Sequence, residues 1–174
     1  MERLKGKTAI ITGGAGGIGL AAVRLFRASG AEVIIADIDE SAGAEAAAET
    51  GARFVKCDVS KSEDVRTVID ACGGKLDVLY NNAGVFWNGR DGRITDIEEG
   101  IWEKVIAINL RSVFLFCKYA IPLLIKQGGM IKIENPWFPG KCQINYSDGK
   151  KESFADRICV LTMDKNLCAE LVKE

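Results

Sequence analysis

A glycine-rich segment, TGGAGGIG at residues 12–19, constrains the fold of this chain more than any other feature. It follows a short apolar run at 8–11 and leads directly into a helical pattern. Its five glycines let the backbone turn tightly between a strand and a helix, and they leave room for a ligand to approach the backbone. Free N–H groups at the start of the helix can then bind an anion. The segment therefore predicts a strand, a turn and a helix that together bind an anionic group.

A carboxylate follows at the distance that a dinucleotide-binding fold requires. The run 32–36 is largely apolar and ends at Asp37, eighteen residues after Gly19. In such folds the turn holds a pyrophosphate, and this acid accepts hydrogen bonds from a ribose diol. A glycine-rich turn alone is often only a loop. The strand before it, the helix after it and the acid at this spacing together predict dinucleotide binding.

Apolar runs of strand length alternate with helical patterns along the first eighty residues. This alternation predicts an α/β fold, a doubly wound parallel sheet covered by helices on both faces, in a single dinucleotide-binding domain over 1–174. Ligands of such sheets bind beyond the carboxyl ends of the strands. The polar and glycine positions that we expect at this edge are Gly13, Asp37, Asp58 and 81–84.

A long helix is expected at 97–125, with Asn109 on its apolar stripe between Val105 and Val113. A buried amide must find hydrogen-bond partners. Two interpretations stay open: a core asparagine satisfied by backbone groups, or part of a polar site that faces a cofactor. Pro122 is expected to kink the helix near its end.

Composition excludes several classes of function. The 174 residues are 48% hydrophobic and carry 23 basic and 24 acidic side chains, so the net charge of −1 offers no basic surface for nucleic acid or an anionic membrane. The apolar run before the glycines is too short for a signal peptide, and a cytoplasmic protein is expected.

The chain has six cysteines and no histidine. No pair of cysteines has C-x-x-C spacing, so a metal site is not expected, and the thiols are expected to be reduced and mostly buried. Without histidine, acid/base chemistry must come from Tyr, Lys, Asp or Glu.

Five motifs in order resemble the short-chain dehydrogenase/reductase family over about residues 5–129: TGGAGGIG, Asp37, CDVS at 57–60, NNAG at 81–84 and KVIAINLRSVF at 104–114. The resemblance implies a Rossmann fold and hydride transfer between a nicotinamide cofactor and a small-molecule alcohol or carbonyl. It also implies a homo-oligomer. By position it assigns the pyrophosphate to Gly13, Gly17, Ile18 and Gly19, the adenosine ribose to Asp37, the adenine to Asp58 and Val59, and the neighbourhood of the ribose to Asn82, Ala83 and Gly84.

The same resemblance matches Asn109 to the family's catalytic asparagine, which holds a water in a proton relay. An acid at position 37 repels a 2′-phosphate and thus favours NAD over NADP. Two simpler roles remain open: Asp58 could cap the following helix, and NNAG could be only a turn after a strand.

After Gly129 the resemblance fails. No Ser or Thr lies between Ser112 and Ser147, so the family's carbonyl-polarising serine has no counterpart. Tyr146 and Lys150 have the spacing of the family's catalytic tyrosine and lysine, but Asp148 and Gly149 between them favour a turn over a helix. The pair is the candidate acid/base, on a divergent tail at 130–174.

The tail also lacks the family's later elements. Residues 130–134 alternate apolar and charged side chains, which indicates an edge strand, and 153–174 has the pattern of one amphipathic helix. The tail is that of a diverged short member, or it is foreign sequence from a truncation, a splice variant or a frame change. Three functions remain: an NAD-dependent dehydrogenase, an NAD-binding protein without catalysis, or a fragment that acts only by association.

Overall fold

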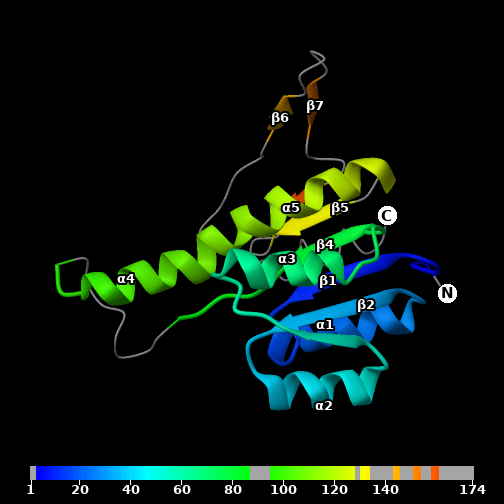
Figure 1. Ribbon diagram of the computed structural model, residues 1–174, viewed down its shortest axis with the longest axis horizontal. Helices are drawn as coiled ribbons and strands as arrows, with labels where there is room; N and C mark the ends of the chain where they lie inside the picture. Colours follow the sequence, from blue (N-terminus) through cyan, green and yellow to red (C-terminus); the bar gives the residue numbers. More distant parts are fainter. Residues whose placement is uncertain are drawn as a thin grey trace.

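The structure is a computed structural model that describes residues 3–86 and 95–127 and four short strands further along the chain. Tyr146 and Lys150 lie outside the described residues. Strand β6 (Gln143–Asn145) pairs with β7 (Lys151–Ser153) in a separate antiparallel hairpin, visible at the top of Figure 1.

A six-stranded sheet forms the centre of the molecule, with every neighbouring pair of strands parallel. The strand order is β3-β2-β1-β4-β5-β8. The strands are β1 (Thr8–Thr12), β2 (Glu32–Asp37), β3 (Arg53–Lys56), β4 (Val78–Asn81), β5 (Met130–Ile133) and β8 (Ile158–Val160). Chain order reverses direction between β1 and β4, which is the point where open parallel sheets bind their ligands. The predicted doubly wound fold is confirmed.

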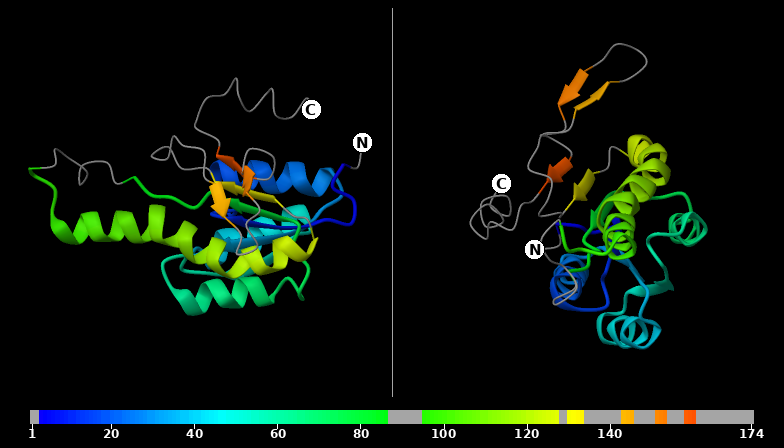
Figure 2. Two further views of the ribbon diagram at one scale, coloured as in Figure 1. Left: turned by 90° about the horizontal axis from the view of Figure 1, so that it is seen from above. Right: turned by 90° about the vertical axis from the view of Figure 1, so that its left-hand side faces the viewer.

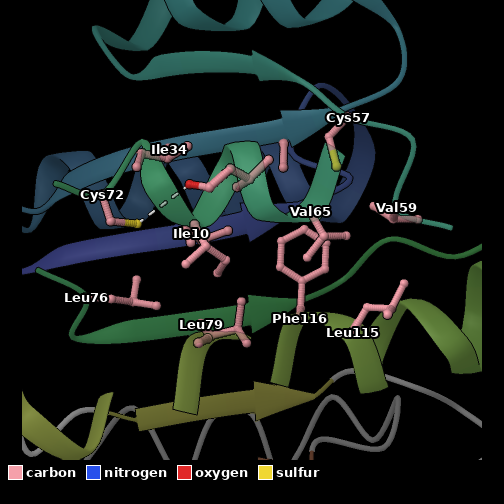
Figure 3. Packing of buried hydrophobic residues seen from close by; sticks show 14 of the residues in the cluster. Ile10, Ile34, Cys57, Val59, Val65, Cys72, Leu76, Leu79, Leu115 and Phe116 are labelled. Carbon is pink, nitrogen blue, oxygen red and sulfur yellow. Dashed lines mark hydrogen bonds between the residues drawn. The ribbon is translucent and has the colours of Figure 1, made fainter. Parts of the chain in front are cut away.

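Helices cover both faces of the sheet because both faces of its inner strands are apolar. Ile10 and Ile34 point to one face, where α3 (Ser62–Asp70) and α5 (Ser112–Gln127) pack (Figure 3). Ile11 and Ile35 point to the other, where α1 (Gly17–Ala28) and α2 (Glu40–Thr50) pack. Successive residues of a strand face opposite sides, so a strand covered on both faces is apolar throughout.

The predicted long helix is present, but its middle turn is π-helical. Helix α4 (Glu99–Ile106) continues through η1 (Ala107–Arg111) into α5. Figures 1 and 2 show α4 projecting past the carboxyl ends of the strands, whereas α5 packs along the sheet. The combined helix is long and apolar enough to cross a membrane by length and composition alone. That is weak evidence, because the core helix of a soluble protein passes the same test, and Phe116 and Ala120 of α5 are fully buried here.

Two expectations for the tail are wrong. Strand β5 is not an edge, because it pairs with β4 on one side and with β8 on the other. Residues 158–160, expected inside an amphipathic helix, form that outer strand. The run Ile-Cys-Val contains two β-branched residues, which favour strands, and an open sheet edge offers it hydrogen bonds. The alternation of apolar and charged residues at 130–134 therefore carried no information about which strands lie beside β5.

Candidate functional site

The glycine-rich loop connects β1 to α1 at the carboxyl edge of the sheet. Gly13 has a φ of +65°, which favours glycine, and its N–H donates to the Ala36 carbonyl at 2.8 Å. Helix α1 has Gly16 as its N-cap, makes no side-chain cap bond and has no acidic residue in its first turn. The first N–H groups of a helix have no partner within it, so those of Gly17, Ile18 and Gly19 are available to an anion.

The side chains of Thr12 and Asn82 link the glycine-rich loop to the end of β4. The Thr12 hydroxyl accepts from the N–H groups of Asn82 and Ala83, each at 3.0 Å. In return, the Asn82 amide Nδ2 donates to the carbonyls of Thr12 at 3.0 Å and Gly13 at 3.1 Å. These four bonds join the ends of β1 and β4, and we call them the Thr12–Asn82 clasp. NNAG is therefore more than a turn after a strand. The role of Thr12, which is 2% exposed, was missed from the sequence.

The glycines of the loop differ in what requires them. A Cβ on Gly19 would overlap the Gly13 carbonyl oxygen and lie 2.6 Å from Asn82 Nδ2. A Cβ on Gly13 would lie 2.9 Å from Ala83 Cα. In contrast, a Cβ on Gly16 or Gly17 would meet nothing within 4 Å. Gly13 and Gly19 are thus required by contacts within the protein, and Gly16 and Gly17 border open space where a ligand fits.

Asp37 lies at the end of β2, beside the glycine-rich loop. One carboxylate oxygen accepts from the Ala15 N–H at 3.0 Å, and the other accepts from the Asp39 N–H at 3.2 Å. The acid therefore holds the loop in place, and each oxygen retains a lone pair for a ribose hydroxyl. Two large apolar side chains at this edge, Ile18 (60% exposed) and Ile38 (64% exposed), add a surface on which a base can stack. Ile38 was missed, although it directly follows the acid.

Asp58 and Val59 lie in the loop between β3 and α3. One Asp58 oxygen accepts from both the N–H and the hydroxyl of Ser60, at 3.1 and 2.7 Å. Burial opposes ionisation of Asp58, but these bonds and nearby Lys61 lower its pKa below the usual value. The residue at the N-cap of α3 is Lys61, so Asp58 closes the turn before the helix and does not cap it. Val59 is buried in the core cluster.

Asn109 lies in the π-helical turn and faces the segment after β4. Its Oδ1 accepts from the Val85 N–H at 2.7 Å, and its Nδ2 donates to the Val85 carbonyl at 2.9 Å. A Cβ on Gly84 would lie 3.4 Å from the same Oδ1. The sequence left two interpretations open: an asparagine satisfied by backbone groups, or part of a polar site that faces a cofactor. Both of these hydrogen bonds are to backbone groups, in agreement with the first interpretation, and they place Asn109 beside the NNAG segment. π-helical turns often occur at functional sites, but no pattern in the sequence indicated this one.

Within the part of the chain that the structure describes, no disulfide bond involves Cys57, Cys72 or Cys117. Burial raises the pKa of Cys57 and of Cys72 to about 12, so both are neutral at physiological pH. No cluster of three metal-ligating side chains occurs within the part of the chain that the structure describes.

The fold is of Rossmann type, and a glycine-rich turn, a helix N-terminus and an acid after β2 meet at the switch point of its parallel sheet. The family model described as short chain dehydrogenase matches residues 7–135. The chain belongs to that family, whose members generally use nicotinamide dinucleotides.

Individual relatives agree with this assignment. Tropinone reductase-like 1 of Erythroxylum coca is 39% identical over 132 residues, which are 72% of this chain and 48% of that protein. The 3-beta-hydroxysteroid dehydrogenase of Comamonas testosteroni is 39% identical over 86% of this chain and 61% of its own length. The (21S)-21-acetoxyl-apo-melianone synthase SDR of Melia azedarach is 36% identical over 98% of this chain and 63% of its own length.

A solved structure is also similar. The crystal structure of gox2181 superimposes with a TM-score of 0.70 at 32% identity, covering 75% of this chain and 54% of that one. The chain thus spans about half to two thirds of the length of the relatives it matches. The family match ends at residue 135, yet the Melia alignment continues through most of the tail.

The different surroundings of Gly19 and Gly16 predict different losses of stability when each is replaced by alanine. Gly19→Ala is expected to destabilise the protein by about 1–3 kcal/mol through overpacking against Gly13, although alanine is the better helix former. Gly16→Ala, at an extended φ of −155° and in open space, meets no overlap and should cost only about 0.5 kcal/mol, because alanine is a poorer N-cap than glycine. Urea denaturation without any ligand measures both. Equal stability of the two variants would contradict this account of the loop.

Proposed function

We propose that this chain binds NAD(H) at the edge formed by the glycine-rich loop, and that it descends from enzymes that transfer hydride between nicotinamide and an alcohol or carbonyl. The observation that supports this most directly is the uncapped, acid-free N-terminus of α1 beside Asp37. The pyrophosphate would lie against Gly13, Gly17, Ile18 and Gly19, with Gly16 and Gly17 leaving the space it needs.

The remaining binding residues divide between contact and support. Asp37 would accept from the adenosine diol, and Asp58 and Val59 would flank the adenine. Ala83 and Gly84 would line the ribose side, while Asn82 would act through the clasp that shapes the loop. When bound, the dinucleotide supplies a hydride donor or acceptor. The charge of Asp37 favours NAD, because a 2′-phosphate placed there would meet a like charge.

Two variants of Asp37 separate its charge from its contact with the loop. We expect the wild-type protein to bind NADH at least about tenfold more tightly than NADPH, which is about 1.4 kcal/mol. Asp37→Asn keeps an oxygen that can accept from Ala15 but removes the charge, so the two affinities should converge. Asp37→Ala should weaken both. Calorimetric titration of the three proteins with each of the two cofactors measures these affinities, and a wild-type protein without preference would contradict the assignment to NAD.

Catalysis is proposed to be weak. Asn109 would support a proton relay beside the cofactor, with Tyr146 as acid/base and Lys150 lowering the pKa of its hydroxyl. The negative charge that develops on a carbonyl oxygen needs preorganised donors, and the family's serine has no counterpart here. Loss of one such donor costs roughly 100- to 1,000-fold in rate. The alternative of an NAD-binding protein without catalysis is favoured by the same absence.

We therefore expect cofactor binding with negligible turnover of small alcohols, ketones and sugars. Absorbance of NADH at its nicotinamide band follows the reaction. Robust turnover that vanishes in Tyr146→Phe would contradict this expectation and establish a competent enzyme. Robust turnover that survives in Tyr146→Phe would show that the acid/base lies elsewhere.

We also propose a cytoplasmic homo-oligomer that associates through the long helix. Four large apolar side chains are exposed along it: Trp102, Leu110, Phe114 and Ile125. Large apolar side chains exposed along one helix favour burial against a partner. Phe114→Glu should lower the sedimentation coefficient to that of a monomer at micromolar concentration, and Leu25→Glu on exposed helix α1 is the matched control. A monomeric wild-type protein would contradict the proposal.

A further inference from the structure

Arg111 joins two segments that are distant in the sequence. It is the last residue of the π-helical turn η1, and its Nη1 donates to the carbonyl of Ser60, fifty-one positions away in the loop between β3 and α3. The guanidinium is on the exposed side of the protein, and it comes from the same turn as Asn109.

The loop that accepts this bond is fixed on its other sides. Asp58 closes the turn through the N–H and hydroxyl of Ser60. The Asp58 N–H donates to Asp64 of α3 at 2.9 Å. Val59 is buried in the core, and Figure 3 shows it at the same end of the cluster as Leu115 of α5. Arg111 bonds this loop to the long helix directly, and Ser62 at the start of α3 adds a hydrogen bond between its hydroxyl and that of Tyr119 in α5 at 2.8 Å.

The π-helical turn thus holds two loops at the carboxyl edge. Asn109 makes two bonds to Val85 in the segment after β4, and Arg111 bonds to Ser60 in the segment after β3. Successive residues of a helix are about 100° apart around its axis, so residues two positions apart point to nearly opposite sides. Asn109 and Arg111 therefore reach different loops from the same turn.

We propose that Arg111 is a positioning residue for the adenine end of the dinucleotide site. Its bond to Ser60 holds the turn of Asp58 and Val59 in the conformation that a purine would contact, so this part of the site is formed before the ligand arrives. A preformed loop loses less conformational entropy on binding. The inference rests on the proposed function, and it assigns Arg111 no contact with the reacting atoms.

The test compares the two halves of the cofactor. Arg111→Met keeps an apolar stem but removes every donor, and Arg111→Lys keeps one charged donor. Nuclear magnetic resonance titration, which measures millimolar affinities, follows binding of ADP-ribose and of nicotinamide mononucleotide. We expect Arg111→Met to weaken the affinity for ADP-ribose about tenfold, which corresponds to the loss of one hydrogen bond from a charged group. The affinity for nicotinamide mononucleotide should not change. Arg111→Lys should recover most of the loss.

The matched control is Arg24→Met. Arg24 is an exposed arginine of α1 that donates two hydrogen bonds to Glu49 of α2, at 2.6 and 2.9 Å. This variant should leave both ligands unchanged. Unchanged ADP-ribose affinity in Arg111→Met would overturn the proposal, and so would equal weakening of both ligands, which would indicate general loosening. Absence of ADP-ribose binding by the wild-type protein would instead overturn the proposed function on which the inference rests.

Discussion

The site depends on the Thr12–Asn82 clasp, which joins the ends of two neighbouring strands. A buried hydroxyl accepts two backbone N–H groups, and a side-chain amide returns two bonds to carbonyls of the glycine-rich segment. Buried polar groups of this kind are costly if a partner is lost, so the clasp leaves the loop little freedom. The Asn82 amide that forms the clasp also lies close to Gly19, where a Cβ would approach its Nδ2 to 2.6 Å.

The carboxylate of Asp37, after β2, orders the glycine-rich loop by accepting from the Ala15 N–H. Under the proposed function, the same carboxylate would also present negative charge toward the adenosine ribose. The proposed cofactor preference and the geometry of the loop would then depend on one side chain. A substitution at Asp37 that changes specificity must also replace an acceptor, which is why asparagine and alanine have different consequences there.

Local patterns predicted most of the fold and the outline of the site. Alternating strands and helices, TGGAGGIG and the spacing to Asp37 are all readable within windows of twenty residues or so. What was missed depends on distant pairing: Thr12 meets Asn82 seventy positions away, and residues 158–160 extend the sheet beside β5. The π-helical turn leaves no periodic signature, because it interrupts the helix by a single residue.

The central claim, that the clasp creates the cofactor loop, is tested most directly by the NADH affinity of Thr12→Val, measured by calorimetry with Thr12→Ser as control. Thr12 is buried and cannot itself reach a ligand. Valine has nearly the same shape but leaves the N–H groups of Asn82 and Ala83 without their acceptor, whereas serine keeps it. The account predicts a loss of at least about tenfold for valine and little change for serine. Wild-type affinity in a folded Thr12→Val protein would contradict it.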